Sequence, residues 1–224
     1  MITRFVIKKE LLAYSLLIIQ PIFMASNLII ARGGVEFAPP ISLAFWRWFT
    51  VFLILSVFNY KVFKKKRFII KEYKKLFFLG FTGCGICGAF PFIAGQTTTV
   101  INMGIIYTSS PIFIILLSYF FFKENMNFFK ILGLISCLIG VLIIIVKGEY
   151  LALIKLKFTK GDLWMLGASI GWALYSIFLF NWKTSFNVFE RFTLISFFGA
   201  LSLFPFYLIE EVYIRNTEFN LIFL

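Results

Sequence analysis

The sequence predicts an all-α integral membrane protein, a multi-helix bundle with about seven transmembrane helices. Hydrophobic residues make up 61% of the 224 residues and charged residues only 14%, whereas soluble domains average about 45–50% and about 25%. The mean hydropathy is +0.94. Apolar stretches of membrane-spanning length recur along the whole chain. Because lipid offers no hydrogen-bonding partner to the backbone, such stretches must form helices or a closed barrel, and their length indicates helices.

The predicted spans follow the apolar stretches in order. A helix of about 20 residues crosses the hydrocarbon layer of about 30 Å. The first stretch is longer than the apolar region of a signal peptide and has no small-residue cleavage site, so we expect it to remain as a span. The predicted spans are residues 11–31, 40–58, 76–97, 102–122, 128–146, 162–182 and 189–209.

Lysine and arginine are unevenly distributed between the predicted loops. With a cytoplasmic N-terminus, 15 of the 22 fall on the cytoplasmic side and six on the other, and Arg47 lies within a span. Eight lie in residues 61–75, KVFKKKRFIIKEYKK, while residues 147–162 place four on the outer side against the trend. Cytoplasmic loops carry the excess of these residues. We therefore expect a multi-pass plasma-membrane (inner-membrane) protein with its N-terminus in the cytoplasm.

The basic loop and the cysteines have simple interpretations. The loop at 61–75 lacks a nucleic-acid motif, so we expect no nucleic-acid partner; an anionic-lipid or protein site is the alternative to a topology signal. The chain has no histidine, the commonest metal ligand and general base. Cys84 and Cys87 form a C-x-x-C pair inside a span, and we interpret them as packing residues. They share one helix face with Gly80, Gly83, Gly88 and Pro91, and Gly167 and Gly171 form a G-x-x-x-G, a pattern typical of close helix packing in lipid. Pro91 and Pro111 predict kinks.

A weak internal repeat relates the second span to the seventh. Residues 44–58, AFWRWFTVFLILSVF, match 188–204, VFERFTLISFFGALSLF, and Arg47 aligns with Arg191. Five spans separate the partners, so the second copy is inverted in the membrane. Inverted repeats are typical of secondary transporters, which bind solute where the repeats meet.

These features resemble the EamA type of the drug/metabolite transporter superfamily. The resemblance lies in ASN of the first span, PPISLAFWRW at the second, GQTTTVINMGIIYTSSPIFIILLSYFFFKEN, ILGLISCLIGVLIIIVKG and GDLWMLGASIGWALYSIFLF. It implies a ten-helix fold of two inverted five-helix repeats around a central cavity, which exports amino acids, other metabolites or drugs. Residues 1–150 correspond to a first repeat and 151–224 to two helices of a second. From this we expect a fragment or truncated product; a short form that oligomerises is the alternative.

Arg47 has two interpretations. The eleven Leu, Ile, Phe and Val residues of 41–58 supply about 5 kcal/mol of insertion energy, which exceeds the cost of about 2.5–3.5 kcal/mol for a central arginine. In one interpretation Arg47 reaches back to the outer interface between Trp46 and Trp48, which act as interfacial anchors. In the other, Ala44, Arg47 and Thr50 face the bundle, where the guanidinium attracts an anionic group or holds a gate.

Other polar and aromatic residues at membrane depth are candidates for a solute site. Each has an alternative role as a hydrogen bond between helices. Together they favour an amphipathic or aromatic solute over an ion. With Arg47, the predicted solute-binding residues are Ser26, Asn27, Gln96, Tyr107, Ser109, Ser110, Trp172, Tyr175 and Ser176.

The function that these patterns favour is transport of a small organic metabolite, such as an amino acid or drug-like solute, by alternating access. The alternative is a non-transporting membrane subunit or inactive truncated remnant. An integral-membrane enzyme is disfavoured because the chain lacks histidine and clustered acids. Glu124, at the end of the fourth span, resembles an acidic residue of the family; we interpret it as structural rather than a proton carrier. We expect no cofactor and no metal; the partners are the solute, lipid and, as an open alternative, a second copy of the chain.

The charge distribution yields a topology prediction. Residues 64–67 should face the cytoplasm and residues 99–102 the opposite side. Impermeant thiol labelling of single cysteines introduced in these segments measures the orientation. Labelling of a Lys65→Cys variant from outside the cell would overturn this topology.

Overall fold

The structure of the protein, a computed structural model, describes residues 2–124, 127–146 and 159–213. This part of the chain is helical and contains no strand. Six of its helical stretches are long and apolar enough to cross a membrane. The helix at Phe128–Val146 adds a further apolar element of 19 residues. The predicted all-α membrane protein is therefore confirmed.

The helices follow the predicted spans closely. The elements are α1 (Ile2–Gly34), α2 (Pro40–Phe58), the 3₁₀ turn η1 (Tyr60–Lys64), α3 (Lys66–Leu79), the π-helical segment η2 (Gly80–Ile86), α4 (Cys87–Gly95), α5 (Val100–Thr108), α6 (Ser110–Phe122), α7 (Phe128–Val146), α9 (Lys160–Asn181) and α10 (Val188–Tyr213).

Three predicted spans differ in detail from the structure. The first, predicted at 11–31, lies within a longer helix, since α1 extends from Ile2 to Gly34. The third begins ten residues early, because α3, η2 and α4 form one continuous stretch from Lys66 to Gly95 whose charged first turns precede the apolar part. That stretch ends at Gly95, so Gln96 lies in a turn rather than within the span. The fourth span is interrupted at Ser109, between α5 and α6, two residues before Pro111. Proline favours the first turn of a helix over its interior, and the interruption at Ser109 agrees with the kink predicted at Pro111. Pro91 lies inside α4, shortly after the π-helical segment η2.

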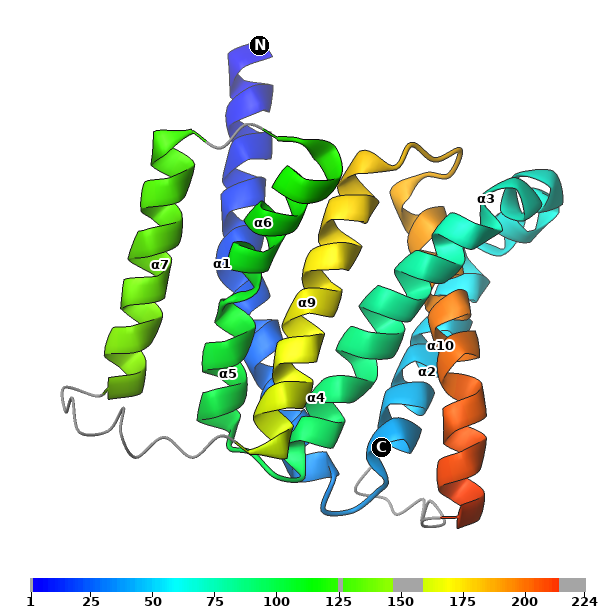
Figure 1. Cartoon of the computed structure of the whole chain (residues 1–224). Coiled ribbons are helices and arrows are strands. Elements are labelled where there is room, and N and C mark those ends of the chain that lie inside the picture. Colours follow the sequence, from blue (N-terminus) through cyan, green and yellow to red (C-terminus); the bar gives the residue numbers. More distant parts are fainter. Residues whose placement is uncertain (1, 125–126, 147–158, 214–224) are drawn as a thin grey trace.

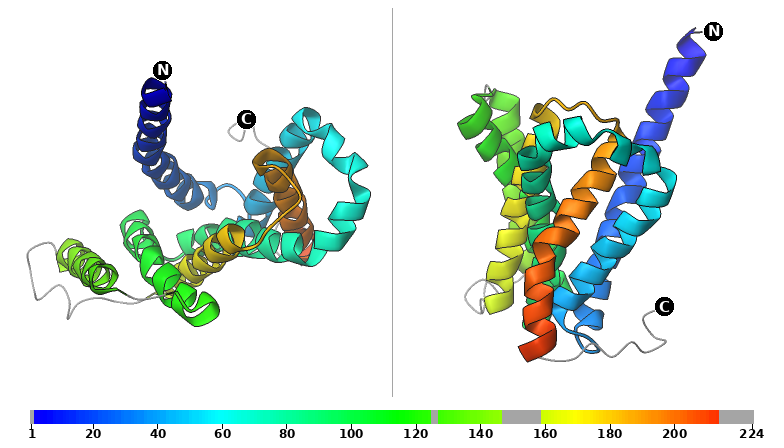
Figure 2. Two further views of the ribbon diagram at one scale, coloured as in Figure 1. Left: turned by 90° about the horizontal axis from the view of Figure 1, so that it is seen from above. Right: turned by 90° about the vertical axis from the view of Figure 1, so that its right-hand side faces the viewer.

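Successive spans run in opposite directions, as Figure 1 shows. α2 and α10, the partners of the predicted repeat, pack extensively against each other and are antiparallel. α4 lies between α1, α2 and α9. Seen from above in Figure 2, α1 stands on one face of the row formed by α5, α4 and α9, and α7 lies at the end of that row.

Small residues let the central helices approach closely. A Cβ on Gly80 would lie 2.6 Å from the backbone nitrogen of Gly199, and one on Gly199 would lie 2.3 Å from the Cβ of Cys84. The thiol of Cys87 lies 3.2 Å from the backbone oxygen of Ala168. These contacts join η2 and α4 to α9 and α10. The packing role predicted for the small-residue face is confirmed.

Buried apolar residues form two clusters. The first joins the C-terminal half of α1, the N-terminal half of α2, and parts of α4, α5, α9 and α10. The second joins η1, α3, η2, the turn before α10 and the start of α10, and contains no α1, α5 or α6 side chain among those described. The bundle is therefore closed by packing from six helices at the end where α1 terminates, and by fewer helices at the other end.

Some expectations concern residues outside the described part of the chain. They are the boundary at 150/151, the lysines of residues 147–158 and the C-terminal stretch 214–224. The structure says nothing of them.

The close approach at Gly199 predicts a stability difference between two matched glycines. Gly199→Ala should destabilise the protein by about 1–3 kcal/mol, because overpacking a filled contact costs this much. Gly104→Ala, where a Cβ would meet nothing within 4 Å, should be neutral or stabilise by up to about 1 kcal/mol through helix propensity. The midpoint of SDS-induced unfolding in mixed micelles measures both. Equal effects of the two substitutions would contradict the packing described for Gly199.

Candidate functional site

A cavity of about 950 Å³ lies among α1, α2, η2, α4, α5, α9 and α10. Its lining comes from both sides of the predicted repeat boundary, because α9 and α10 follow residue 150 and the other elements precede it. Ligand cavities of proteins commonly measure about 300–1,000 Å³. The volume suits a small organic molecule.

One face of α1 forms a wall of this cavity. Leu16, Gln20, Phe23 and Asn27 line it, and their spacing of three and four residues places them on one side of a helix. Ile18 and Ile22 lie on the opposite side of the same turns and do not line the cavity, although side chains on both sides of this part of α1 are exposed. α1 thus separates the cavity from the lipid.

Arg47 projects from α2 into the bundle. Its guanidinium donates to the side-chain oxygen of Asn27 on α1 and, over 3.2 Å, to the backbone oxygen of Gly88 on α4. The guanidinium carbon lies 5.3 Å from the ring centre of Trp48 and 5.0 Å from that of Phe92. The bundle-facing interpretation is therefore confirmed for Arg47, which does not reach back to the interface, and Ala44 is buried. It is wrong for Thr50, which is exposed and does not line the cavity.

Gly88 makes this arrangement possible. A Cβ there would lie 2.5 Å from Nε1 of Trp48 and 3.6 Å from Nη2 of Arg47. Trp48 therefore packs flush against α4 and lines the cavity beside Arg47. The alternative role of Trp48 as an interfacial anchor does not hold.

Aromatic rings form the opposite wall. The ring centres of Tyr107 and Trp172 are 6.3 Å apart, and those of Trp172 and Tyr175 are 5.5 Å apart. Phe192 of α10 closes the wall against Trp48, with ring centres separated by 6.2 Å. Among the described residues that line the cavity, Arg47 is the one with a charged side chain.

The structure brings half of the predicted site residues together. Asn27, Arg47, Tyr107, Trp172 and Tyr175 all line the cavity. This placement is geometric, and their role in binding remains a prediction.

The other predicted residues lie outside the cavity lining. Ser26 is exposed and donates to the backbone oxygen of Ile22, 2.9 Å away. Gln96 is exposed in the turn after α4. Ser109 and Ser110 donate to backbone oxygens one turn earlier in α5, at Ile106 and Tyr107, as hydroxyls within helices often do. Ser176 is half-buried on α9.

Thirteen of the eighteen lining residues were not predicted as site residues, among them Gln20, Trp48 and Phe192. Gln20 precedes Asn27 by seven residues, so a search for polar residues on one helix face would have found it. Trp48 follows Arg47 directly, but its orientation depends on Gly88, far away in sequence. Phe192 follows Arg191 in the repeat, where its partner is Trp48.

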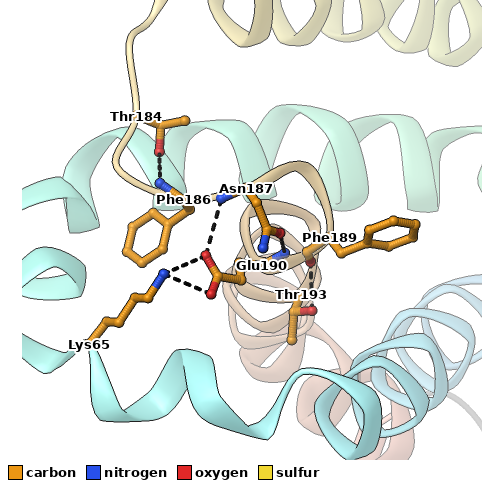
Figure 3. Close-up of polar contacts among 7 residues, drawn as sticks. All are labelled: Lys65, Thr184, Phe186, Asn187, Phe189, Glu190 and Thr193. Carbon is orange, nitrogen blue, oxygen red and sulfur yellow. Dashed lines mark hydrogen bonds and ion pairs between the residues drawn. The ribbon is translucent and has the colours of Figure 1, made fainter.

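Buried carboxylates tie the two sides of the repeat boundary together at one end of the bundle. Glu190 of α10 accepts from Nζ of Lys65 at 2.8 Å and from the backbone nitrogen of Asn187 at 3.1 Å (Figure 3). Glu72 of α3 accepts from the hydroxyl of Thr184 at 2.7 Å and from the backbone nitrogen of Ser185 at 2.9 Å. Both contacts join the α3 region to the connection between α9 and α10.

At the opposite end of the bundle, two further carboxylates link the helices before residue 150 to those after it. Glu210 of α10, 2% exposed, accepts from the backbone nitrogen and hydroxyl of Ser42 at 2.6 and 3.0 Å. It thereby satisfies free donors at the N-terminus of α2, where a negative charge is also favoured by the helix dipole. Asp162 of α9 accepts from the hydroxyl of Thr98 at 2.5 Å and caps its own helix together with Thr159.

Glu124 has no link to the cavity. It is exposed and pairs with Lys130 across the short connection to α7, with 3.4 Å between the charged atoms. This contact fits the structural role predicted for Glu124. Within the described ranges, no three Cys, Asp or Glu side chains cluster as metal ligands would.

Comparison with known proteins places these features in a family context. Residues 11–146 match the EamA-like transporter family. The chain is 28% identical to the uncharacterized transporter YyaM of Bacillus subtilis (strain 168) over 172 residues, which cover 75% of this chain and 56% of that protein. It is 30% identical to the uncharacterized transporter YoaV of the same organism over 158 residues, covering 66% and 50%. An uncharacterized transporter of Archaeoglobus fulgidus is 28% identical over 166 residues, covering 72% and 55%. The chain spans about half the length of these curated relatives. No solved structure matches it.

The α1 wall predicts a periodic pattern of accessibility. In a chain whose native cysteines are replaced, Gln20→Cys should react with a hydrophilic methanethiosulfonate reagent at least about tenfold faster than Ile22→Cys, because the thiolate that reacts forms in water and not in lipid. Labelling kinetics in proteoliposomes measure both. Equal rates at the two positions would show that α1 does not separate a hydrated cavity from lipid.

Proposed function

We propose that this chain, which belongs to the EamA-like transporter family, contributes the solute pathway of a membrane transporter for small organic molecules, operating by alternating access. The observation that carries the proposal is the cavity of about 950 Å³ lined from both sides of the repeat boundary. In inverted-repeat transporters the solute binds where the repeats meet. We assign residues 1–150 to the first repeat and residues from 151 onward to the second.

The packing supports a state that is closed at one end. The apolar cluster of six helices closes the bundle where α1 ends and α2 begins. The lining of the cavity extends from there along α1 to Leu16, toward the N-terminus of that helix. With the cytoplasmic N-terminus that the charge distribution favours, the cavity in this state opens toward the cytoplasm, and the protein resides in the plasma membrane.

We assign the moving wall to the N-terminal half of α1. Between Tyr14 and Ser26 the described side chains of α1 are exposed, apart from the half-buried Met24. The four carboxylate contacts instead hold α2, α3, α4, α9 and α10 as a frame at both ends. Pro21 lies within α1, where it removes one helical hydrogen bond and lowers the cost of bending. Closure of α1 onto the frame would seal the cavity on the cytoplasmic side.

The proposal is tested by blocking the cavity. Because the free Cys84 and Cys87 also line the cavity, the native cysteines are first replaced. Proteoliposomes containing the Gln20→Cys variant of this chain are loaded with a defined mixture of aromatic acids, aromatic amines and amino acids, and the released solutes are identified by mass spectrometry. A bulky maleimide attached at Gln20→Cys should reduce protein-dependent release by more than about tenfold, because one such group fills much of a cavity of this size. The same reagent on the matched, lipid-facing Ile22→Cys variant should leave release unchanged.

Two results would overturn the proposal. Release that is independent of the protein for every solute would favour a non-transporting membrane subunit. Equal inhibition at the two positions would place the solute pathway elsewhere than in this cavity.

A further inference from the structure

Arg47 and Trp48, which line the cavity, each carry a buried donor without an acceptor. Nε of Arg47 and Nε1 of Trp48 are shielded from solvent and have no hydrogen-bond partner among the described residues. A guanidinium has five N–H groups, and the contacts to Asn27 and Gly88 use two of them. A buried donor without a partner is costly, more so when it is charged. Retaining two such donors side by side indicates that a ligand supplies the acceptor.

The guanidinium of Arg47 and the indole of Trp48 lie together against Gly88 of α4, where Nη2 of Arg47 also donates to the backbone oxygen. Trp48 Nε1 and Arg47 Nη2 lie 2.5 and 3.6 Å from the point where a Cβ on Gly88 would stand. The absence of a side chain at Gly88 thus leaves both groups at one spot on the α4 surface. A carboxylate has two oxygens that can accept from a guanidinium and from a second donor at once.

The remainder of the lining is suited to an uncharged body. Tyr107, Trp172, Tyr175 and Phe192 supply ring faces, and no described lining residue is acidic. A second positive charge on the solute would be repelled by Arg47 and would find no carboxylate. A second negative charge would find no second cation, and an unpaired charge away from water is strongly disfavoured.

Building on the transport function proposed above, we propose that the solute is an amphipathic monoanion, a carboxylate on an aromatic or apolar body, held by Arg47 and Trp48. The carboxylate takes the spare N–H groups of Arg47 together with the indole N–H of Trp48. The aromatic body lies against Tyr107, Trp172 and Tyr175. The site discriminates against cations and zwitterions with the same body.

The test is a series of probes that share one body and differ in charge. Binding of radiolabelled 3-phenylpropionate to the chain in nanodiscs of neutral lipid is measured, with competition by 3-phenylpropanamide, 3-phenylpropylamine and L-phenylalanine. The acid should bind at least about tenfold more tightly than each competitor, since one charge-assisted hydrogen bond is worth this much. The amine should be the weakest of the series.

Variants assign the binding to the two donors. Arg47→Gln should weaken binding of the acid at least about tenfold, and Arg47→Lys should restore little because an ammonium lacks the planar fork. Trp48→Phe keeps the guanidinium and the ring face but removes the indole N–H; it should weaken the acid about three- to tenfold and leave the amine, which offers no acceptor, unchanged. Arg32→Gln is the matched control, because Arg32 pairs with the exposed Glu36 away from the cavity.

The outcomes test the ligand class and the transport function separately. Unchanged binding of the acid to Trp48→Phe and Arg47→Gln, tighter binding of the amine, or no binding of any probe would overturn the substrate class. If Arg47→Gln fails to fold, Trp48→Phe decides alone. Release of the amine from proteoliposomes, but not of the acid, would leave the transport function standing and remove the substrate class. Arg47-dependent binding of the acid with no flux of any probe would leave the ligand class standing and remove the transport function.

Discussion

The positive charge of Arg47 inside the membrane is the constraint on which the centre of this structure depends. The apolar residues of α2 can carry an arginine into the bilayer, but the guanidinium then needs acceptors that lipid cannot provide. Asn27 of α1 and the backbone of Gly88 supply two, and the rings of Trp48 and Phe92 lie within about 5 Å of the charge. These contacts hold α1, α2 and α4 together around the guanidinium of Arg47, which lines the cavity.

The carboxylates complement this arrangement at the ends of the bundle. Glu72 and Glu190 fix one end and Asp162 and Glu210 the other, each by accepting hydrogen bonds across the repeat boundary. Association of helices in lipid depends on packing and hydrogen bonds rather than on exclusion of water. Such contacts hold the frame firmly, so the least restrained wall of the cavity is α1.

The sequence predicted the spans, the close packing of the small residues and the bundle-facing option for Arg47, because each depends on local pattern. Features that depend on tertiary contacts were beyond it. Ser26 and Asn27 are neighbours in sequence, yet the rotation of about 100° per residue in a helix places one in the lipid-facing surface and the other on the cavity. Trp48 could not be assigned to the cavity without knowing that Gly88 lies opposite. The carboxylates near the span ends gave no sign of the distant partners that they hold.

The two proposals, that the solute binds at Arg47 and that α1 closes onto the frame, together predict that binding at Arg47 draws α1 toward the frame. Spin labels at Ile18→Cys on α1 and Phe180→Cys on α9, both on exposed positions, report this distance by double electron–electron resonance in nanodiscs. Saturating 3-phenylpropionate should shift the distance distribution to shorter values, and Arg47→Gln should abolish the shift. A distribution that stays unchanged while the probe is bound would contradict the account.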